Sequence, residues 1–486
     1  MTPSVPTGRL PDRVDVTVIG AGVVGAAVAR ELSALDLEVA VVESRHDVGD
    51  ATSKANTAIL HTGFDATPGT LESALVSRGY GLLRAYAQVV GIPVEQTGAV
   101  LVAWTPEELA ELPALERTAV ANGYTESAMV GPDALYRDVP ALGPGALGGL
   151  TVPGESLICS WTTALAFATE AVERGAHLRL GCRVEGMSRQ VEGMSRQVEH
   201  TVLHTTYGDL ASRWVVNVAG LASDLVDGWF GYRRFTVTPR RGELLVYDKQ
   251  ARSLVDRIVL PVPTSRGKGV LVAPTVYGNV MLGPTADDRD DRDDTSTSET
   301  GLSFLLEKGA TVLPALLDEE VTAAYAGLRA ATEHKDYVID VDASQRYAVV
   351  GGIRSTGLTA SMAIAGHVTA ALLDAGLDAA RRRDLPGPPR MPNLGESFPR
   401  PYQRADLIAT DGSYGRVVCF CERVTAGEIR DAFASTIPPT SLGGLRRRTR
   451  ALNGRCQGFY CGAEVRRLFA AFQGGAGPSP ATTEAR

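Results

Sequence analysis

Hydrophobic residues near the beginning of the chain form two short continuous runs on either side of a longer mixed segment. Residues 14–19 are mostly β-branched and predict a buried strand, whereas residues 26–35 have a composition that favours a helix. Three glycines stand between these segments and predict a tight turn. A second apolar run, residues 39–42, predicts a parallel strand beside the first. The pattern indicates that the chain opens with a βαβ unit.

Similar patterns return farther along the chain. Residues 162–174 predict a helix that leads into a short strand at 177–180, and residues 214–219 predict another buried strand. Residues 242–247 and 269–273 alternate as strands of a second sheet do. The sequence therefore predicts an α/β fold in which a Rossmann-like domain is interleaved with an antiparallel-sheet domain that faces the substrate.

Proline and cysteine mark a separate unit near the carboxyl end. Six prolines between positions 386 and 401 interrupt any helix or central strand, and four of the six cysteines follow within 43 positions. We expect a linker there, then a small α-rich domain and a flexible tail. Within residues 1–383, the expected boundaries are about 14–79, 150–228 and 330–383 for the Rossmann-like domain and about 80–149 and 229–329 for the antiparallel-sheet domain. For the rest of the chain, the expected boundaries are 384–415 for the linker, 416–473 for the small domain and 474–486 for the tail.

Composition and charge limit the class of partner. The chain has 486 residues, of which 44% are hydrophobic and 21% charged, so it is expected to bury a sizeable core. Its 48 Lys and Arg residues against 56 Asp and Glu give a net charge of −8, which disfavours nucleic acid as a partner. The longest early uncharged run, residues 16–29, is shorter than the ~18 residues of a membrane span, and no signal peptide precedes it. We expect a cytoplasmic protein without a transmembrane segment, or one that is peripheral at the membrane through a partner.

The glycine-rich turn has the residues that a bound dinucleotide requires. In Gly20-Ala21-Gly22-Val23-Val24-Gly25 the first glycine permits the turn, the second admits a diphosphate and the third lets the helix pack on the strand. The helix amino terminus adds free N–H groups. Glu43, at the end of the second strand, is placed to accept both ribose hydroxyls. The alternative is a glycine-rich site of helix packing.

Three further segments identify the class of dinucleotide enzyme. They are ATSKANTAILHTG at 51–63, NVAG at 217–220 and GIRSTGLT at 352–359. Together they resemble the D-amino-acid-oxidase-like flavoprotein superfamily. Within it, the chain is most similar, over residues 14–470, to the FAD-dependent glycerol-3-phosphate dehydrogenases of the anaerobic-type large subunit, with the L-2-hydroxyglutarate oxidases as close relatives. An ordinary glycine turn is the alternative for residues 351–359.

The resemblance implies FAD and a set of residues that hold it. Thr52 and Ser53 would bind the diphosphate, the segment that begins at Asn56 would pass beside the isoalloxazine, and residues 357–359 would contact the flavin at a helix amino terminus. Such a terminus stabilises the negative charge of reduced flavin. With the glycine motif, the candidate cofactor-binding residues are Gly20, Ala21, Gly22, Val24, Gly25, Glu43, Ser44, Thr52, Ser53, Asn56, Val184, Gly220, Gly357, Leu358 and Thr359.

Oxidation of a secondary alcohol requires a base and a cation that orients the acid group of the substrate. Of the seven histidines, His61 lies on the segment expected beside the flavin and is the candidate base. Arg329 and Arg354 resemble the anion-binding arginines of the family. The alternatives are a packing role, or a covalent attachment to the flavin, for the histidine and surface salt bridges for the arginines.

The clustered cysteines indicate a metal centre. Cys419, Cys421, Cys456 and Cys461 supply four soft thiolates. Their spacing, with the segment GRCQG around Cys456, resembles the bacterioferritin-associated-ferredoxin-like [2Fe-2S] domain. Zinc is the main alternative, and free thiols are another. Four arginines between the cysteine pairs, Arg446, Arg447, Arg448 and Arg450, form a solvated helix face, offset the negative charge of the cluster, or bind an anionic partner.

Taken together, these patterns predict an FAD-dependent dehydrogenase for a small anionic alcohol. The resemblance implies sn-glycerol 3-phosphate as substrate, dihydroxyacetone phosphate as product and a [2Fe-2S] cluster as the electron exit. The acceptor would be a quinone, an electron-acceptor protein or a membrane-associated partner subunit. Two alternatives stay open: a dehydrogenase or oxidase for a 2-hydroxy acid, a secondary amine or an amino acid, and a noncatalytic redox adaptor.

Overall fold

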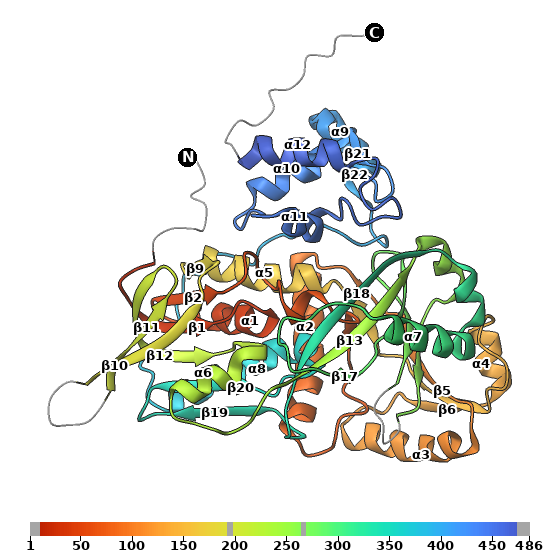
Figure 1. The fold of residues 1–486 in the computed structure, drawn as a ribbon, viewed down its shortest axis with the longest axis horizontal. Coiled ribbons are helices and arrows are strands. Elements are labelled where there is room, and N and C mark those ends of the chain that lie inside the picture. Colours follow the sequence, from red (N-terminus) through yellow and green to blue (C-terminus); the bar gives the residue numbers. More distant parts are fainter. Residues whose placement is uncertain (1–9, 192–197, 264–268, 474–486) are drawn as a thin grey trace, which may run out of the picture.

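The computed structural model describes residues 10–191, 198–263 and 269–473. Figure 1 shows two β-sheets side by side in the main body, with helices around them, and a small helical unit above them at the carboxyl end. The α/β fold class and the α-rich carboxyl-terminal unit that we predicted are confirmed, whereas the exact domain boundaries stay a prediction. None of the described helices combines the length and the apolar character needed to cross a membrane.

The helices are α1 Val23–Leu32, α2 Leu71–Val90, α3 Pro106–Ala121, α4 Pro132–Asp138, α5 Ser160–Glu173, α6 Ser223–Trp229, α7 Glu299–Val312, α8 Gly357–Asp374, α9 Ala405–Thr410, α10 Ala426–Ala434, α11 Leu442–Thr449 and α12 Gly462–Gln473. The strands of the first half are β1 Arg13–Ile19, β2 Val39–Glu43, β3 Ile59–Leu60, β4 Val94–Glu95, β5 Ala99–Ala103, β6 Ala128–Val130, β7 Gly148–Val152, β8 Ser156–Ile158, β9 His177–Leu180, β10 Val184–Val191, β11 Val198–Thr205 and β12 Gly208–Asn217. The later strands are β13 Thr238–Tyr247, β14 Ile258–Pro261, β15 Leu271–Pro274, β16 Val280–Gly283, β17 Asp287–Asp288, β18 Val321–Ala331, β19 Val338–Asp342, β20 Tyr347–Gly351, β21 Val417–Cys419 and β22 Val424–Thr425.

The first sheet has a parallel centre. Its strands β20, β12, β1, β2 and β9 pair in that order and in parallel, while β10, β11 and β19 extend it in antiparallel fashion. Strand β1 is buried along most of its length, in agreement with its β-branched sequence. The duplicated segment 184–197 begins in the β10–β11 hairpin, and its last six residues lie outside the described part of the chain. Parallel strands end at one edge, where α/β sheets bind their ligands.

Small and apolar residues hold the helices against this sheet. Helices α1, α5 and α8 form its main core with β1 and β2, through residues such as Val16, Val28 and Ile364 that are fully buried. Figure 1 shows α1, α2 and α8 together near the middle of the molecule. Helix α1 begins at Val23, three residues before the predicted start, because the chain turns helical directly after Gly22. The helix amino terminus therefore lies at the glycine turn.

The second sheet is mixed and mainly antiparallel. Its order is β17, β13, β16, β15, β14, β5, β7 and β6, and β18 pairs with the other edge of β13. Only β14 and β5 run parallel. The long β13–β18 pair begins beside the first sheet, as Figure 1 shows, and carries Gly242 opposite Gly327 and Arg240 opposite Arg329. This pair brings the antiparallel sheet to the pocket described below.

The carboxyl-terminal unit has its own small core. Val424, Ile429, Leu445 and Val465 are completely buried in it. The segment that we predicted as a linker, 384–415, runs without helix or strand to residue 400 and then contains α9, which begins after the last proline of the segment. Its backbone is hydrogen-bonded to the main body, since Met391 N–H donates to Val90 O at 2.8 Å and Glu396 N–H to Val276 O at 2.9 Å. The segment is packed rather than free.

Candidate active site and cysteine centre

A cavity of about 180 Å³ lies where the two sheets meet. Twelve of the predicted residues line it: Gly22, Val24, Gly25, Thr52, Ser53, Asn56, His61, Gly220, Arg329, Arg354, Gly357 and Leu358. Ala21, Glu43 and Thr359 are hydrogen-bonded next to it. Val184 is not among the lining residues; it begins β10, where it pairs with Thr205. The roles of all these residues stay predictions.

No side chain fits at Gly20 or Gly25 of the glycine turn. A Cβ atom on Gly25 would lie 2.0 Å from the Gly20 carbonyl oxygen, and one on Gly20 would lie 2.6 Å from Val218 O. Gly20 also has a φ of 110°, which L side chains rarely adopt. At the helix start, Val23 N–H donates to Ser53 Oγ at 2.9 Å, so one free amide of the first turn already binds an oxygen. This turn fits a diphosphate.

Replacing Gly25 by Ala is expected to destabilise the protein by about 1–3 kcal/mol and to empty the flavin site, because the methyl group must push Gly20 aside. The measurement is thermal unfolding together with the flavin content of the purified protein. Gly81→Ala is the matched control: Gly81 lies in α2 and has no atom within 4 Å of an added Cβ, so this variant should keep its flavin and unfold no earlier. Equal behaviour of the two variants would contradict the prediction.

Glu43 ends β2 and turns back to the glycine turn. Its Oε2 accepts from Ala21 N–H at 2.7 Å, and its Oε1 accepts from Arg45 N–H at 2.7 Å and from the Ser44 hydroxyl at 3.2 Å. Burial raises the pKa of the Glu43 carboxyl, and these hydrogen bonds oppose that rise. The carboxylate thus fixes the turn, and a ribose hydroxyl would join this network.

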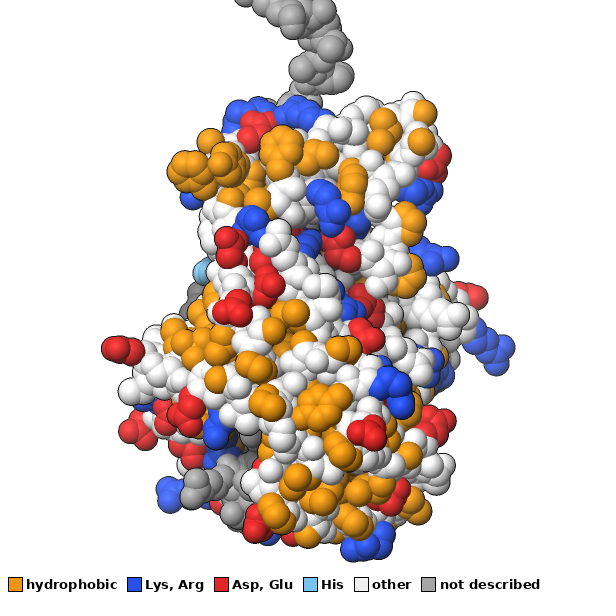
Figure 2. Space-filling view, turned by 90° about the vertical axis from the view of Figure 1, so that its right-hand side faces the viewer, with side chains coloured by type: hydrophobic (Ala, Val, Ile, Leu, Met, Phe, Trp, Pro, Cys, Tyr) orange, Lys and Arg blue, Asp and Glu red, His pale blue; other side chains and the backbone are white. Residues whose placement is uncertain are grey.

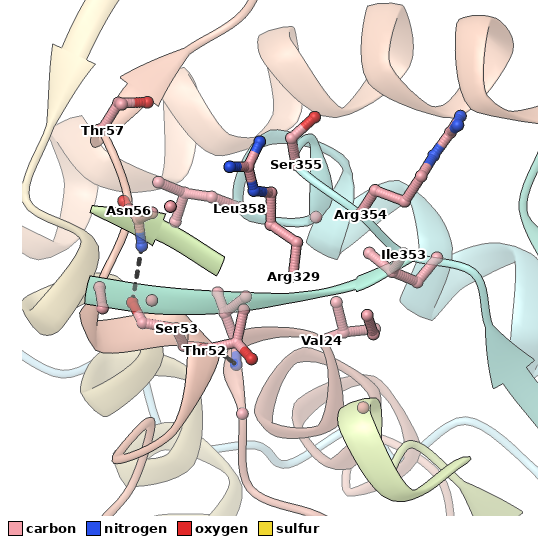
Figure 3. Close-up of a pocket in the computed structure, with 18 of the residues that line it drawn as sticks. Val24, Thr52, Ser53, Asn56, Thr57, Arg329, Ile353, Arg354, Ser355 and Leu358 are labelled. Atoms are coloured by element: carbon pink, nitrogen blue, oxygen red, sulfur yellow. Dashed lines mark hydrogen bonds between the residues drawn. The ribbon is translucent and has the colours of Figure 1, made fainter. Parts of the chain in front are cut away.

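The loop before β3 and the start of α8 form the middle of the pocket. Asn56 Nδ2 donates to Ser53 O at 2.7 Å, the bond drawn in Figure 3. Thr52 Oγ1 donates to Leu328 O of β18 at 2.7 Å, which ties this loop to the second sheet. Gly357 and Leu358 line the cavity at the first turn of α8, whose amides lack intrahelical acceptors. These amides suit a flavin that gains negative charge on reduction.

His61 enters the cavity with a buried acid behind it. Its Nδ1 lies 3.0 Å from Oε2 of Glu155, a residue with no solvent exposure. Glu155 Oε1 also accepts from Thr62 N–H at 2.6 Å and from Thr62 Oγ1 at 2.9 Å. Since a carboxylate only accepts, Nδ1 carries the proton and Nε2 of a neutral imidazole is left as an acceptor. Glu155 stands 94 positions from His61 and belongs to no motif, so the sequence alone does not reveal it.

Arg329 is a partly buried cation in the same cavity. Its Nη2 donates to Thr285 O at 2.6 Å, and no carboxylate of the described residues forms an ion pair with it. Burial, and then the neighbouring Arg240, lower the pKa of the Arg329 guanidinium to about 10, so it is charged at neutral pH. Figure 3 shows its side chain pointing from β18 toward Ser355. A bound anion would compensate a partly buried cation of this kind.

Arg354 also lines the cavity, but its guanidinium is engaged elsewhere. Its Nη2 donates to Glu72 Oε2 at 3.0 Å and to Lys335 O at 2.6 Å. In Figure 3 this guanidinium lies away from that of Arg329. The structure therefore places both predicted arginines at the cavity, and of the two only Arg329 forms no ion pair with a carboxylate of the described residues.

The four cysteines of the carboxyl-terminal unit interact in two pairs across two loops. Cys421 lies close enough to Cys456, and Cys461 close enough to Cys419, for the neighbouring thiol to shift its pKa. A Cβ on Gly454 would lie 2.3 Å from Cys421 Cβ, so the second loop approaches the first as closely as glycine allows. Among the described residues, no three or more His, Cys, Asp or Glu side chains are arranged around one common metal position.

Charge and hydrogen bonds at these sulfurs suit a cluster. Burial, and after it the neighbouring Cys419, raise the pKa of Cys461 to about 12, so iron binding would have to displace a firmly held proton there. Burial raises the pKa of Cys456 too, but hydrogen bonds from the 458–460 amides and from Cys421 outweigh this and lower it overall. Amides aimed at a sulfur also tune the potential of an iron–sulfur cluster. The donor set therefore fits [2Fe-2S].

The arginines between the cysteine pairs do not form a solvated face. Arg448 and Arg450 are only 5% and 4% exposed, and α11 is turned toward the main body. Arg448 donates from both terminal nitrogens to Asp47 at 2.8 Å, and Arg447 Nη2 joins the same carboxylate at 2.7 Å. The solvated-face interpretation is wrong for these residues, because the acid that they meet lies in another part of the same chain.

Arg450 links the cysteine loop to aromatic side chains of the main body. Its guanidinium lies 4.2 Å from the ring centre of Tyr277, and it pairs with Glu422, next to Cys421, at 2.8 Å. Tyr277 stacks on Trp161 with ring centres 5.0 Å apart. Trp161 Nε1 in turn donates to Lys54 O, beside the cavity loop, at 3.0 Å. A continuous series of side chains thus joins the cavity loop to the cysteine loop.

Replacing Asp47 by Asn should release the carboxyl-terminal unit, because it leaves the buried Arg448 without its acid and Arg447 with only Asp50, and costs about 3–5 kcal/mol. Differential scanning calorimetry should then resolve a separate, earlier transition, and a protease should cut the 384–400 segment faster. The control is Asp50→Asn. In this variant Arg447 loses Asp50 but is still paired with Asp47. One unchanged transition in Asp47→Asn would contradict the prediction.

The ion pairs of Asp47 make the stability of the carboxyl-terminal unit depend on pH. Burial raises the pKa of Asp47, but Arg448 and Arg447 outweigh it and lower the pKa below its ordinary value. The stabilisation is therefore complete above that ordinary value of ~3.9 and is lost as the pH falls through the lower value of the folded protein. Calorimetry of the unmodified protein should show the separate transition only in acid.

Comparison with known proteins defines the class. Residues 15–372 match the family model "FAD dependent oxidoreductase" (DAO), and residues 417–471 match the BFD-like [2Fe-2S] binding domain. The chain belongs to this FAD-dependent oxidoreductase family and is an enzyme of that class, with FAD and a [2Fe-2S] cluster as its cofactors.

Individual relatives narrow the comparison. The chain is 32% identical to a glycerol 3-phosphate dehydrogenase of Caloramator mitchellensis over 463 residues, 94% of each chain. The solved structure of an L-alpha-glycerophosphate oxidase from Mycoplasma pneumoniae with FAD bound superposes with a TM-score of 0.73 at 27% identity, covering 79% of this chain and all of that one. The human mitochondrial L-2-hydroxyglutarate dehydrogenase is 28% identical over 56% of this chain and 60% of its own length.

Proposed function

We propose that this enzyme oxidises sn-glycerol 3-phosphate to dihydroxyacetone phosphate and passes the electrons through its [2Fe-2S] centre to a quinone or a protein acceptor. The observation that carries the substrate class is Arg329, a partly buried cation that forms no ion pair with any described carboxylate and lines the cavity that also receives His61. A phosphate group would supply the missing charge. The similarity to glycerol 3-phosphate dehydrogenase over nearly the whole chain supports the phosphate.

In the proposed reaction, each group of cavity residues has a separate role. Bound FAD supplies the hydride acceptor, held by the glycine turn, the loop at Thr52–Lys54 and the first turn of α8. Arg329 binds and orients the anionic group of the substrate. His61 takes the hydroxyl proton at Nε2, while Glu155 holds the proton on Nδ1 and stabilises the imidazolium that forms. Leu244 and Pro284, which line the cavity, exclude water beside these groups.

The substrate is tested by anaerobic visible spectroscopy of the protein loaded with both cofactors. Addition of glycerol 3-phosphate should bleach the flavin band first and the cluster band after it. L-2-Hydroxyglutarate is the second candidate, because a guanidinium also binds carboxylates and because the hydroxyglutarate dehydrogenases are relatives. Bleaching by L-2-hydroxyglutarate or by an amino acid alone would overturn the phosphate assignment, and bleaching by none of them would favour the redox adaptor. The predicted cytoplasmic location stays a prediction.

A further inference from the structure

Three aromatic side chains beside the cysteines are unusually exposed. Phe420, Phe459 and Tyr460 are 72%, 85% and 76% exposed, the three highest values among the large hydrophobic side chains of the described residues. Phe420 stands between Cys419 and Cys421, and Phe459 and Tyr460 directly precede Cys461. We call these three residues the aromatic patch. Their neighbours in sequence, Cys419 and Cys461, are buried, so the patch forms the outer edge of the cysteine centre.

Within residues 10–191, 198–263 and 269–473, no contact accounts for this exposure. The rings of Phe459 and Tyr460 contact each other edge to face with centres 5.2 Å apart, and the core of the carboxyl-terminal unit is formed without them. Exposed aromatic groups of this size are typical of interaction sites, where they become the main contacts. Figure 2 shows hydrophobic side chains reaching the surface among Lys and Arg in this upper part of the molecule.

Charge identifies the kind of partner. Residues 416–473 contain ten arginines, no lysine and four acids, although the whole chain has a net charge of −8. Eight of the ten arginines form ion pairs, with acids of this unit, of the 384–415 segment or of the main body; Arg416 and Arg467 share Glu464. Arg466, five positions after Cys461, is exposed and has no ion pair among the described residues. This free positive charge favours an acidic partner.

We propose that the aromatic patch is the docking surface for an acidic electron-carrier protein. Docking there brings the carrier against the cysteine loops themselves and near Arg466, whose Nη1 would lie 3.3 Å from a Cβ on Gly462, next to Cys461. The proposal rests on the proposed function, because it takes the [2Fe-2S] centre as the electron exit. Beyond the proposed function, it names the surface and the residues of this chain that bind the acceptor protein, and the charge of that acceptor.

The experiment measures binding to the enzyme loaded with both cofactors, in the absence of substrate. The probe is an acidic blue-copper protein, titrated calorimetrically at low ionic strength, and a basic c-type cytochrome is the probe of opposite charge. The Phe459→Ser/Tyr460→Ser variant should weaken binding of the acidic probe by about tenfold or more. The matched control is Phe304→Ser, an exposed aromatic on α7 in the main body, which should bind as the unmodified enzyme does. Phe420→Ser provides an independent variant of the patch.

Folding and cluster content of each variant are checked by the visible spectrum, and flavin reduction by substrate should stay unchanged. Binding of the acidic probe that weakens with salt and with the patch variants supports the proposal. No binding of the acidic probe, equal binding by the patch variants, tighter binding of the basic probe, or self-association abolished by the variants would each overturn it. Because no substrate is present, a wrong substrate assignment leaves these results unchanged and is detected only by the flavin titration.

Discussion

Replacing Arg329 by Met is expected to lower kcat/KM for glycerol 3-phosphate by roughly 30- to 4,000-fold, which corresponds to about 2–5 kcal/mol for a buried charge pair that loses one partner. The side chain is partly buried in the cavity and forms no ion pair with a carboxylate of the described residues, although Arg240 and Asp288 act on its charge from nearby, so a substrate anion would be its strongest partner. Methionine fills similar space without charge. The measurement is the steady-state rate with a small dye as electron acceptor, with flavin content determined in parallel.

Arg354→Met is the matched control. This arginine lines the same cavity, but its charge is already balanced by Glu72. We therefore expect a change of less than about tenfold in kcat/KM, in line with a partly exposed ion pair. An equal loss in both variants would show that the two arginines share the anion. An unchanged rate in Arg329→Met would remove Arg329 from the site.

The local part of this site is predictable from the sequence. The strand, the glycine turn and the helix follow one another without interruption, so the residues that form the turn are contiguous in the chain. The same holds for the loop that carries Thr52, Ser53 and His61, and for the start of α8 at Gly357. Hydrophobic period and glycine spacing report such local geometry directly. Helix ends were predicted less well, as the early start of α1 shows.

The contacts between distant segments are not predictable in this way. Glu155 reaches His61 across 94 positions, and Asp47 reaches Arg448 across 401. Both acids lie in short loops whose composition is ordinary, and only the packing of the sheets and of the carboxyl-terminal unit brings them to their partners. The same limitation explains the misinterpretation of the arginines on α11. A charged run was interpreted as solvated because its acid is encoded in a remote part of the chain.

Glu155→Gln is expected to lower the rate of flavin reduction by substrate by about 10²–10⁴-fold, with little change in KM. The carboxylate accepts the Nδ1 proton of His61 and thereby leaves Nε2 free to act as base. An amide can instead donate to Nδ1, which moves the proton to Nε2 and selects the unproductive tautomer. Glu155 is a positioning residue, since it acts through His61. The measurement is stopped-flow absorbance of the flavin under anaerobic conditions.

Thr62→Val separates this effect from simple loss of structure. Its hydroxyl donates to the other oxygen of the same carboxylate, at 2.9 Å, and the backbone N–H of residue 62 still donates there after the change. The His61–Glu155 contact remains, so flavin reduction should slow by less than about tenfold even if the protein loses about 1 kcal/mol of stability. If both variants were slow to the same degree, Glu155 would be acting through the packing of the loop. A slow Glu155→Gln beside a fast Thr62→Val isolates the tautomer of His61 as the cause, because only the first variant changes which nitrogen carries the proton.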